Sequence, residues 1–292
     1  MENGFYNYLT PSTSDKDWGL YINVAGYAEI NPGTIYPPKG HPSGYYFTWD
    51  SGRKLNEFQI IYITDGYGVF ETREKTWTIS PGTIITLHPG IWHRYKPKQN
   101  TGWKEYYAGF MGSLANQNIM TRYSQFLTDP VVYIGFQEKI LDIYNRLIEE
   151  VKEEKPGYQQ VCSGLLIYLI GNLVSIKRNK EFGGKVIKEK ILKARLHIKG
   201  NIDNNIDMQE LASDLNLSYS YFRTMFKKYT GTSPTQYHLM LKLQKAREMI
   251  VSTNKSIKEI SNKLNFNSIF YFSQIFKQKM GIRPSKLRKW PD

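Results

Sequence analysis

The carboxy-terminal third of the chain repeats one order of apolar and polar positions. In residues 256–288, Ile257, Ile260 and Leu264 recur at the spacing of a helix face, and a second apolar set follows after a short break. That set comprises Ile269, Phe272, Ile275 and Phe276. The pattern predicts two short helices joined by a tight turn, with the second helix ending at Gly281.

Residues 207–234 follow the same plan. Each stretch opens with a side chain that can cap a helix, Asp207 in one and Ser256 in the other, and Glu follows three positions later. Asn216 and Asn265 stand at the two turns, and Asn tolerates the left-handed backbone conformation that such a turn needs. Two helices with an exposed, basic second member can place side chains in the DNA major groove, although a hairpin that only packs shows the same pattern.

A single long helix is predicted between the two stretches. Ser233 and Pro234 favour its start, because Ser caps helices and Pro is tolerated in the first turn. Residues 234–251 would span about 27 Å, which approaches the length of about 34 Å of one DNA turn. One chain is therefore expected to read two successive major grooves.

The positive charge of the chain lies in the same region. The formal net charge is +13. Residues 1–184 hold 18 Lys and Arg against 18 Asp and Glu, whereas residues 185–292 hold 21 against 8. A basic domain with two groove-sized helices is typical of a protein that binds the phosphate backbone.

Together, the two stretches resemble the double helix-turn-helix domain of the AraC/XylS family of bacterial transcription regulators. The resemblance covers about residues 185–290. Its most specific residues are Ile257, Ile260, Asn265, Phe266, Phe272, Phe276, Lys277, Gly281, Pro284 and Arg288. Both units depart from the usual glycine at the turn, where this chain has Asn216 and Asn265.

The resemblance implies which side chains read DNA. The base-reading positions are Ser220, Arg223, Thr224, Ile269, Phe270, Ser273 and Gln274. The phosphate-binding positions are Lys227, Lys228, Lys277 and Lys279. Arg223 suits guanine and Gln274 suits adenine, because each can form a bidentate pair with that base.

The first part of the chain has short runs rich in β-branched and aromatic residues, separated by Gly and Pro turns. Phe58–Thr64, Gly68–Thr72 and Thr83–Leu87 are typical of strands, and their spacing predicts a sandwich or barrel. The run from Gly52 to Tyr95 resembles the cupin-type sensor domain of the same family, whose barrel mouth holds a small ligand, often a sugar. The expected ligand-binding residues are Trp49, Arg53, Trp92, His93 and Tyr95.

A metal-dependent cupin enzyme is a weaker interpretation. Such sites need about three His and a carboxylate around one ion, but this region has only His41, His88 and His93, without a His-x-His pair. We therefore predict no metal, no cofactor and no catalytic residue, and expect His93 to hydrogen-bond a ligand or a neighbouring strand. Bound metal or turnover would favour the alternative, an isomerase or dioxygenase with a DNA-binding appendage.

Two further helices are predicted over residues 137–155 and 158–180. The second is apolar around much of its circumference, so it must bury more than one face. The family resemblance implies a homodimer contact there, and packing within one chain is the alternative. Its most apolar run, Leu165–Val174, is too short to cross a membrane. The single Cys162 and the absence of a secretory pattern indicate a cytoplasmic protein.

These patterns predict an α+β chain of two domains. Residues 1–180 form a cupin-like sensing and dimerisation domain, and residues 181–292 form the all-α double helix-turn-helix domain. The predicted function is a ligand-responsive, sequence-specific transcription regulator, an activator of carbohydrate-utilisation genes. Its expected partners are double-stranded DNA, a sugar effector, RNA polymerase and a second copy of the chain, with no membrane. A constitutive DNA-binding protein with a vestigial barrel is the other alternative.

Overall fold

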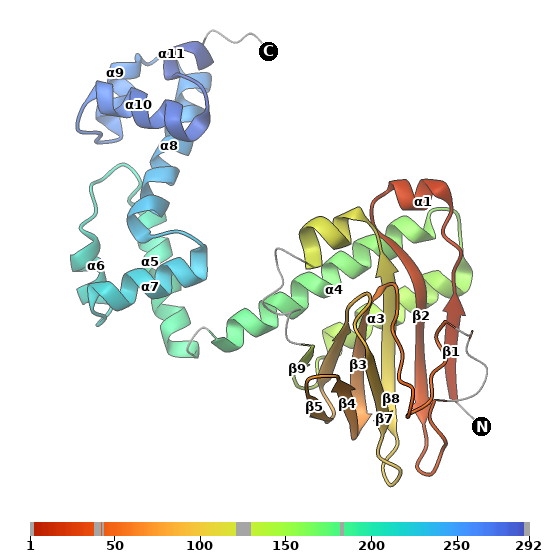
Figure 1. Ribbon diagram of the computed structural model, residues 1–292. Coiled ribbons are helices and arrows are strands. Elements are labelled where there is room, and N and C mark those ends of the chain that lie inside the picture. The colour runs from red at the N-terminus through yellow and green to blue at the C-terminus, as the bar shows by residue number, and fades with distance from the viewer. Residues whose placement is uncertain (1–2, 38–41, 43, 121–129, 182–183, 289–292) are drawn as a thin grey trace. The chain divides into compact units, whose positions relative to one another are not determined.

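The computed structural model describes residues 3–37, 42, 44–120, 130–181 and 184–288. The chain divides into two compact units, Met1–Arg178 and Asn179–Asp292. The first is rich in strands and the second is helical (Figure 1), so the predicted two-domain α+β class is confirmed. His41 lies outside the described residues.

Two antiparallel sheets build the first unit. The larger sheet contains, in spatial order, β1 (Asn3–Tyr8), β2 (Tyr21–Ile30), β8 (Trp103–Met111), β3 (Phe58–Gly66), β6 (Thr83–Leu87) and β9 (Val131–Tyr133). The smaller sheet contains β5 (Thr76–Ile79), β4 (Gly68–Thr72) and β7 (His93–Pro97). Short helical segments, α1 (Thr13–Asp17) and η1 (Ala115–Ile119), lie outside the sheets.

Strand β3 is buried on both faces. Ile60 and Tyr62 belong to the core that the large sheet forms with two helices, α3 (Glu138–Glu153) and α4 (Tyr158–Glu181). Ile61 and Ile63 alternate with them and belong to a second core, between the large sheet and the small one. Burial on both faces explains why Ile60–Ile63 form an uninterrupted apolar run.

Helix α4 is a core helix of the first unit. Cys162, Leu166, Leu169 and Leu173 are fully buried in the core beneath the large sheet. Burial raises the pKa of the Cys162 thiol to about 12. Residues Tyr158–Lys180 are long and apolar enough to cross a membrane. The most apolar run in the sequence, Leu165–Val174, is too short to indicate this by itself. Core helices of soluble proteins share this length and composition, and the inner residues of this helix are buried.

The second unit contains two helix-turn-helix pairs. Helix α5 (Lys185–Gly200) precedes the first pair, α6 (Met208–Asp214) and α7 (Tyr219–Thr230). Helix α8 (Pro234–Ser252) leads to the second pair, α9 (Ile257–Lys263) and α10 (Ile269–Met280), and α11 (Pro284–Leu287) follows. Each pair has its own hydrophobic core, and α8 contributes Leu241 to the first core and Leu243 to the second.

The predicted turns and caps are present. Asn216 and Asn265 have φ angles of 52° and 49°, the left-handed conformation expected of them. Ser256 and Glu259 form the reciprocal capping box, whereas Asp207 caps α6 through the backbone N–H groups of Gln209 and Glu210. The assignment of Ile269 to the apolar face was wrong, because the Ile269 side chain is 44 % exposed at the start of α10.

Candidate ligand pocket and DNA interface

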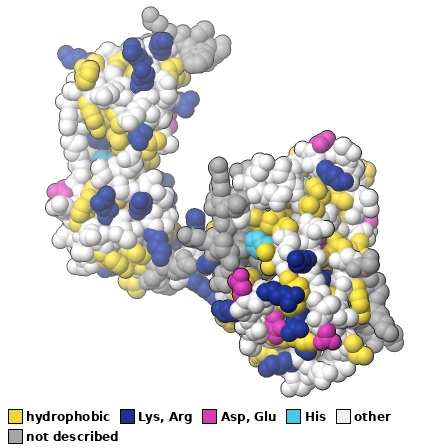
Figure 2. Space-filling view, in the orientation of Figure 1, with side chains coloured by type: hydrophobic (Ala, Val, Ile, Leu, Met, Phe, Trp, Pro, Cys, Tyr) yellow, Lys and Arg dark blue, Asp and Glu magenta, His cyan; other side chains and the backbone are white. Residues whose placement is uncertain are grey.

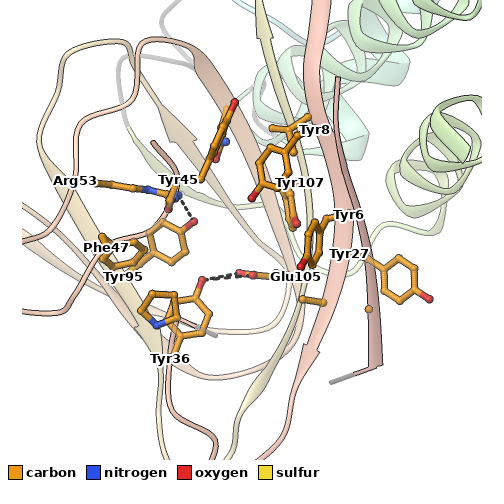
Figure 3. Close-up of a pocket in the computed structure, with 15 residues that line it drawn as sticks. Tyr6, Tyr8, Tyr27, Tyr36, Tyr45, Phe47, Arg53, Tyr95, Glu105 and Tyr107 are labelled. Carbon is orange, nitrogen blue, oxygen red and sulfur yellow. Dashed lines mark hydrogen bonds between the residues drawn. The ribbon is translucent and has the colours of Figure 1, made fainter. Parts of the chain in front are cut away.

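A cavity of about 180 Å³ opens between the large sheet and residues that precede β3 (Figure 3). Strands β1, β2, β3, β7 and β8 supply part of its wall, and the segment between β2 and β3 supplies the rest. The wall comprises Gly4, Tyr6, Tyr8, Val24, Tyr27, Ala28, Tyr36, Pro37, Tyr45, Phe47, Arg53, Gln59, Tyr95, Glu105 and Tyr107. It is therefore dominated by tyrosine, with one carboxylate and one guanidinium.

Arg53 is held in place at the pocket by several partners. Its Nη2 donates to the Tyr95 hydroxyl at 2.6 Å, and its Nη1 donates to the Tyr45 carbonyl. The guanidinium carbon lies 4.9 Å from the centre of the Phe47 ring and 5.4 Å from that of Tyr95. Because these contacts fix the planar guanidinium, Arg53 presents a positioned positive charge rather than a mobile one.

His93 supports Arg53 from behind. The two residues exchange backbone hydrogen bonds, and Arg53 Nε donates to His93 Nε2 at 3.2 Å. His93 Nδ1 lies 3.0 Å from the Ile91 carbonyl, to which it donates when Nε2 is the acceptor. Burial and the Arg53 charge lower the pKa of His93 to about 4, so the ring is neutral at pH 7.

The two predicted tryptophans lie outside the lining of this cavity. The Trp49 ring lies beneath Arg94, whose guanidinium carbon is 4.2 Å from the ring centre. Trp92 donates from Nε1 to the Ser51 carbonyl at 2.9 Å and lines another hollow, beside β4 and β6. Of the five predicted ligand residues, the structure therefore brings Arg53 and Tyr95 to the cavity wall and places His93 one contact away.

Most of the tyrosine wall was not predicted from the sequence. Tyr6 and Tyr8 alternate on β1, and Glu105 and Tyr107 alternate on β8, so each pair shares a sheet face. Figure 3 shows these four side chains turned towards the space that Arg53 and Tyr95 also face, whereas the labelled Tyr27 ring points away. The alternation within each strand could have been recognised in the sequence. The pairing of β1 with β2, which brings these residues to one cavity, could not.

Tyr36 and Glu105 form the other polar side of the wall. The Tyr36 hydroxyl lies 3.4 Å from each Glu105 carboxylate oxygen, and Glu105 is only 6 % exposed. Burial, reinforced by the nearby Glu105, raises the pKa of Tyr36 well above its usual range. Burial raises the pKa of Tyr107 similarly. These phenols are therefore neutral at pH 7 and can act as hydrogen-bond donors.

A buried carboxylate behind the wall orients two lining residues. Glu57 accepts hydrogen bonds from Asn23 Nδ2 at 2.7 Å, from Gln59 Nε2 at 2.9 Å and from the Tyr45 hydroxyl at 3.0 Å. Burial raises the pKa of Glu57, and these donors act against the rise. Gln59 and Tyr45 are thereby held at the cavity, which presents aromatic faces together with fixed donors and acceptors.

The residues of α7 that are predicted to contact DNA share one exposed face. Phe222, Met225 and Phe226 anchor the opposite side of the helix in the first helix-turn-helix core. The exposed face carries Ser220, Arg223, Thr224, Lys227 and Lys228, all of which line one surface hollow. The spacing of these positions by three or four residues brings them together on the helix.

Most of the α10 residues that are predicted to contact DNA are also exposed. Phe270 is 77 % exposed, and Gln274, Lys277 and Lys279 are exposed, while Ser273 is partly covered. Phe272 and Phe276 hold the helix to its core. Figure 2 shows many Lys and Arg side chains and few acidic ones on the visible face of the helical unit. An exposed apolar residue beside polar and basic ones suits a groove that presents thymine methyl groups and phosphates.

Among the described residues, no three His, Cys, Asp or Glu side chains gather as a metal site would require. A β-rich unit with a tyrosine-lined pocket, followed by two helix-turn-helix pairs, defines a ligand-responsive DNA-binding regulator. The profile of the AraC-like ligand binding domain matches residues 22–170, and that of a helix-turn-helix domain matches residues 211–289. The chain belongs to the AraC family of transcription regulators.

Characterised relatives are similar along most of their length. The raffinose operon transcriptional regulatory protein RafR of Pediococcus pentosaceus is 27% identical over 83% of this chain and 88% of its own. The lactose operon transcription activator of Staphylococcus xylosus is 25% identical over 77% of this chain and 81% of its own. The MmsAB operon regulatory protein of Pseudomonas aeruginosa is 23% identical over 82% and 77%.

Proposed function

We propose that this AraC-family regulator responds to a sugar that binds in the tyrosine-lined cavity, and that it activates genes of carbohydrate utilisation. The cavity carries the proposal, because aromatic faces suit the C–H surfaces of a sugar and fixed polar groups suit its hydroxyls. Relatives named for raffinose and lactose operons support the same ligand class.

The size of the cavity favours a single sugar ring. An apolar cavity of roughly 150 Å³ holds benzene, and this cavity measures about 180 Å³. One pyranose or furanose ring is therefore the expected occupant, either a monosaccharide or the terminal unit of a longer chain. Glu105 and Arg53 would accept from and donate to its hydroxyls, and Tyr95 and Tyr107 would contribute rings and further donors.

For DNA, we propose that α7 and α10 enter successive major grooves. Arg223 would read guanine and Gln274 adenine, with Ser220, Thr224, Ile269, Phe270 and Ser273 completing the base contacts. Lys227, Lys228, Lys277 and Lys279 would bind phosphates. Their common exposure supports these roles.

The outward face of α4 supports a homodimer. Val161 and Tyr168 are 47 % and 50 % exposed, and Gly164 and Gly171 have open space beyond their Cα atoms. An exposed apolar stripe with small residues allows two helices to approach closely. We further propose that the protein is cytoplasmic, contacts RNA polymerase and catalyses no reaction.

The test is a ligand screen with the full chain. Binding to the folded state raises the unfolding temperature, so a panel of monosaccharides and disaccharides is screened by thermal shift. We expect a shift with one monosaccharide that Glu105→Gln abolishes and the exposed control Asn145→Gln retains. No shift with any sugar would refute the sugar proposal, and turnover or stoichiometric metal would favour an enzyme.

A further inference from the structure

The two helix-turn-helix pairs are joined by polar contacts. Their hydrophobic cores, as formed by the described residues, have no buried side chain in common. Helix α8 contributes side chains to both cores, so its packing in each core restricts how the two pairs are arranged. Contacts that reach across from one pair to the other restrict their relative rotation further.

The segment between α5 and α6 makes such contacts. The side chain of Asn265, at the turn of the second pair, donates from Nδ2 to the Asp203 carbonyl at 2.6 Å. Asp203 also forms an ion pair with Lys245 of α8 at 2.7 Å. The short segment that precedes the first pair is thus bound both to α8 and to the turn of the second pair.

Lys242 of α8 adds further contacts of this kind. We call the set formed by Asp203, Asn205, Lys242, Lys245 and Asn265 the polar joint. Its Nζ donates to Asn205 Oδ1 at 3.1 Å and to the Asn265 carbonyl at 3.5 Å, and it lies 5.7 Å from the centre of the Phe266 ring. Lys242 is only 6 % exposed. A buried ammonium is costly unless it is hydrogen-bonded, so its burial favours the one arrangement that supplies both acceptors.

We propose that Lys242 and Asn265, through Asp203 and Asn205, fix the rotation of α10 relative to α7 and thereby determine the spacing of the two DNA blocks that the protein accepts. These are positioning residues, since they lie away from the proposed base contacts. The inference rests on the proposed reading of DNA by α7 and α10.

The experiment measures the tolerance of spacing by the full-length protein. An operator is selected from random duplex DNA, and its two blocks are then moved apart or together by one base pair. Each step shifts one block by about 3.4 Å and turns it by roughly 35°. We expect the wild-type protein to lose on the order of tenfold or more in affinity at either altered spacing.

Two variants loosen the joint in different ways. Asn265→Gly keeps the left-handed turn but removes the amide that holds Asp203, and Lys242→Met keeps the apolar stem but removes the ammonium. Each variant should lose no more than roughly threefold in affinity at the altered spacings. Lys258→Met, on the exposed side of α9, is the control and should behave as the wild type.

Three outcomes oppose the inference. Full wild-type discrimination by both variants, with melting temperatures showing that they are folded, would overturn it. Equal loosening by Lys258→Met would attribute the effect to charge rather than to the joint. Failure of the wild-type protein to select any operator would refute the proposed function and this inference with it.

Discussion

At the scale of single residues, the pocket depends on the neutral state of His93. The ring donates to the Ile91 carbonyl and accepts from Arg53, so a second ring proton would leave two donors facing each other. A buried histidine beside an arginine is thereby kept unprotonated, and Arg53 retains its orientation at the cavity.

The first prediction concerns acid stability. The pKa of His93 is about 4 in the folded protein and about 6.5 when unfolded. The unfolded chain therefore takes up the proton first, and stability present above pH 6.5 falls as the pH drops towards 4, by on the order of 3 kcal/mol. Chemical denaturation at several pH values in this range measures the free energy of unfolding, which should depend less steeply on pH in His93→Gln than in the wild type. The exposed control His197→Gln should keep the wild-type dependence. An unchanged dependence in His93→Gln would contradict the lowered pKa of His93.

The second prediction separates base reading from phosphate binding. Arg223→Ala should weaken operator binding by about 1–3 kcal/mol and relax selection at one base pair. Lys227→Ala should weaken binding to all sequences alike and reduce the salt slope by about 1. Titrations of operator and scrambled DNA at several salt concentrations measure both. Equal effects of the two variants on scrambled DNA would contradict the division of roles.

Residue-scale prediction from the sequence succeeded where the local chain determines conformation. Asn216 and Asn265 were correctly placed at left-handed turns, because turn geometry depends on immediate neighbours. The tyrosine wall was not found, since Tyr6 and Glu105 meet only when β2 pairs with both β1 and β8. Long-range strand register is not encoded in any short window of sequence.

At the scale of elements, α4 has two faces with different surroundings. Its inner residues lie in the core under the large sheet, and its outer stripe of Val161, Gly164, Tyr168 and Gly171 is open. The sequence predicted burial of more than one face. Within one chain, the structure provides a partner for the inner face.

The third prediction tests the outer face. Val161→Glu places a charge in the proposed dimer contact and should raise the dimer dissociation constant by at least about tenfold, because an unpaired buried charge is costly. Asn145→Glu introduces the same side chain at an exposed position of α3 and should leave association unchanged. Sedimentation equilibrium measures both, and a fully dimeric Val161→Glu protein would exclude this face.

At the scale of the whole molecule, charge and ligand binding belong to different units. The cavity lies in the first unit, in the part of the chain with balanced charge, and the excess of positive charge lies in the helical unit. The ligand can alter DNA binding only if it binds two states of the protein with different affinity.

The fourth prediction follows from this linkage. If the sugar changes operator affinity by some factor, the operator must change sugar affinity by the same factor, expected to be roughly 5–150-fold. Calorimetric titration of the sugar into the free protein and into its operator complex measures the second factor. Equal sugar affinities, together with unchanged operator affinity, would identify a constitutive DNA-binding protein.

The buried thiol has a practical consequence for measuring such changes. Cys162 is fully enclosed and its raised pKa keeps it protonated, so maleimide reagents should leave the native chain unlabelled. A cysteine introduced at an exposed position of α7 and another on α10 can therefore carry a fluorophore pair without any background mutation. Energy transfer between the two dyes would then report any change in the distance between α7 and α10 in solution.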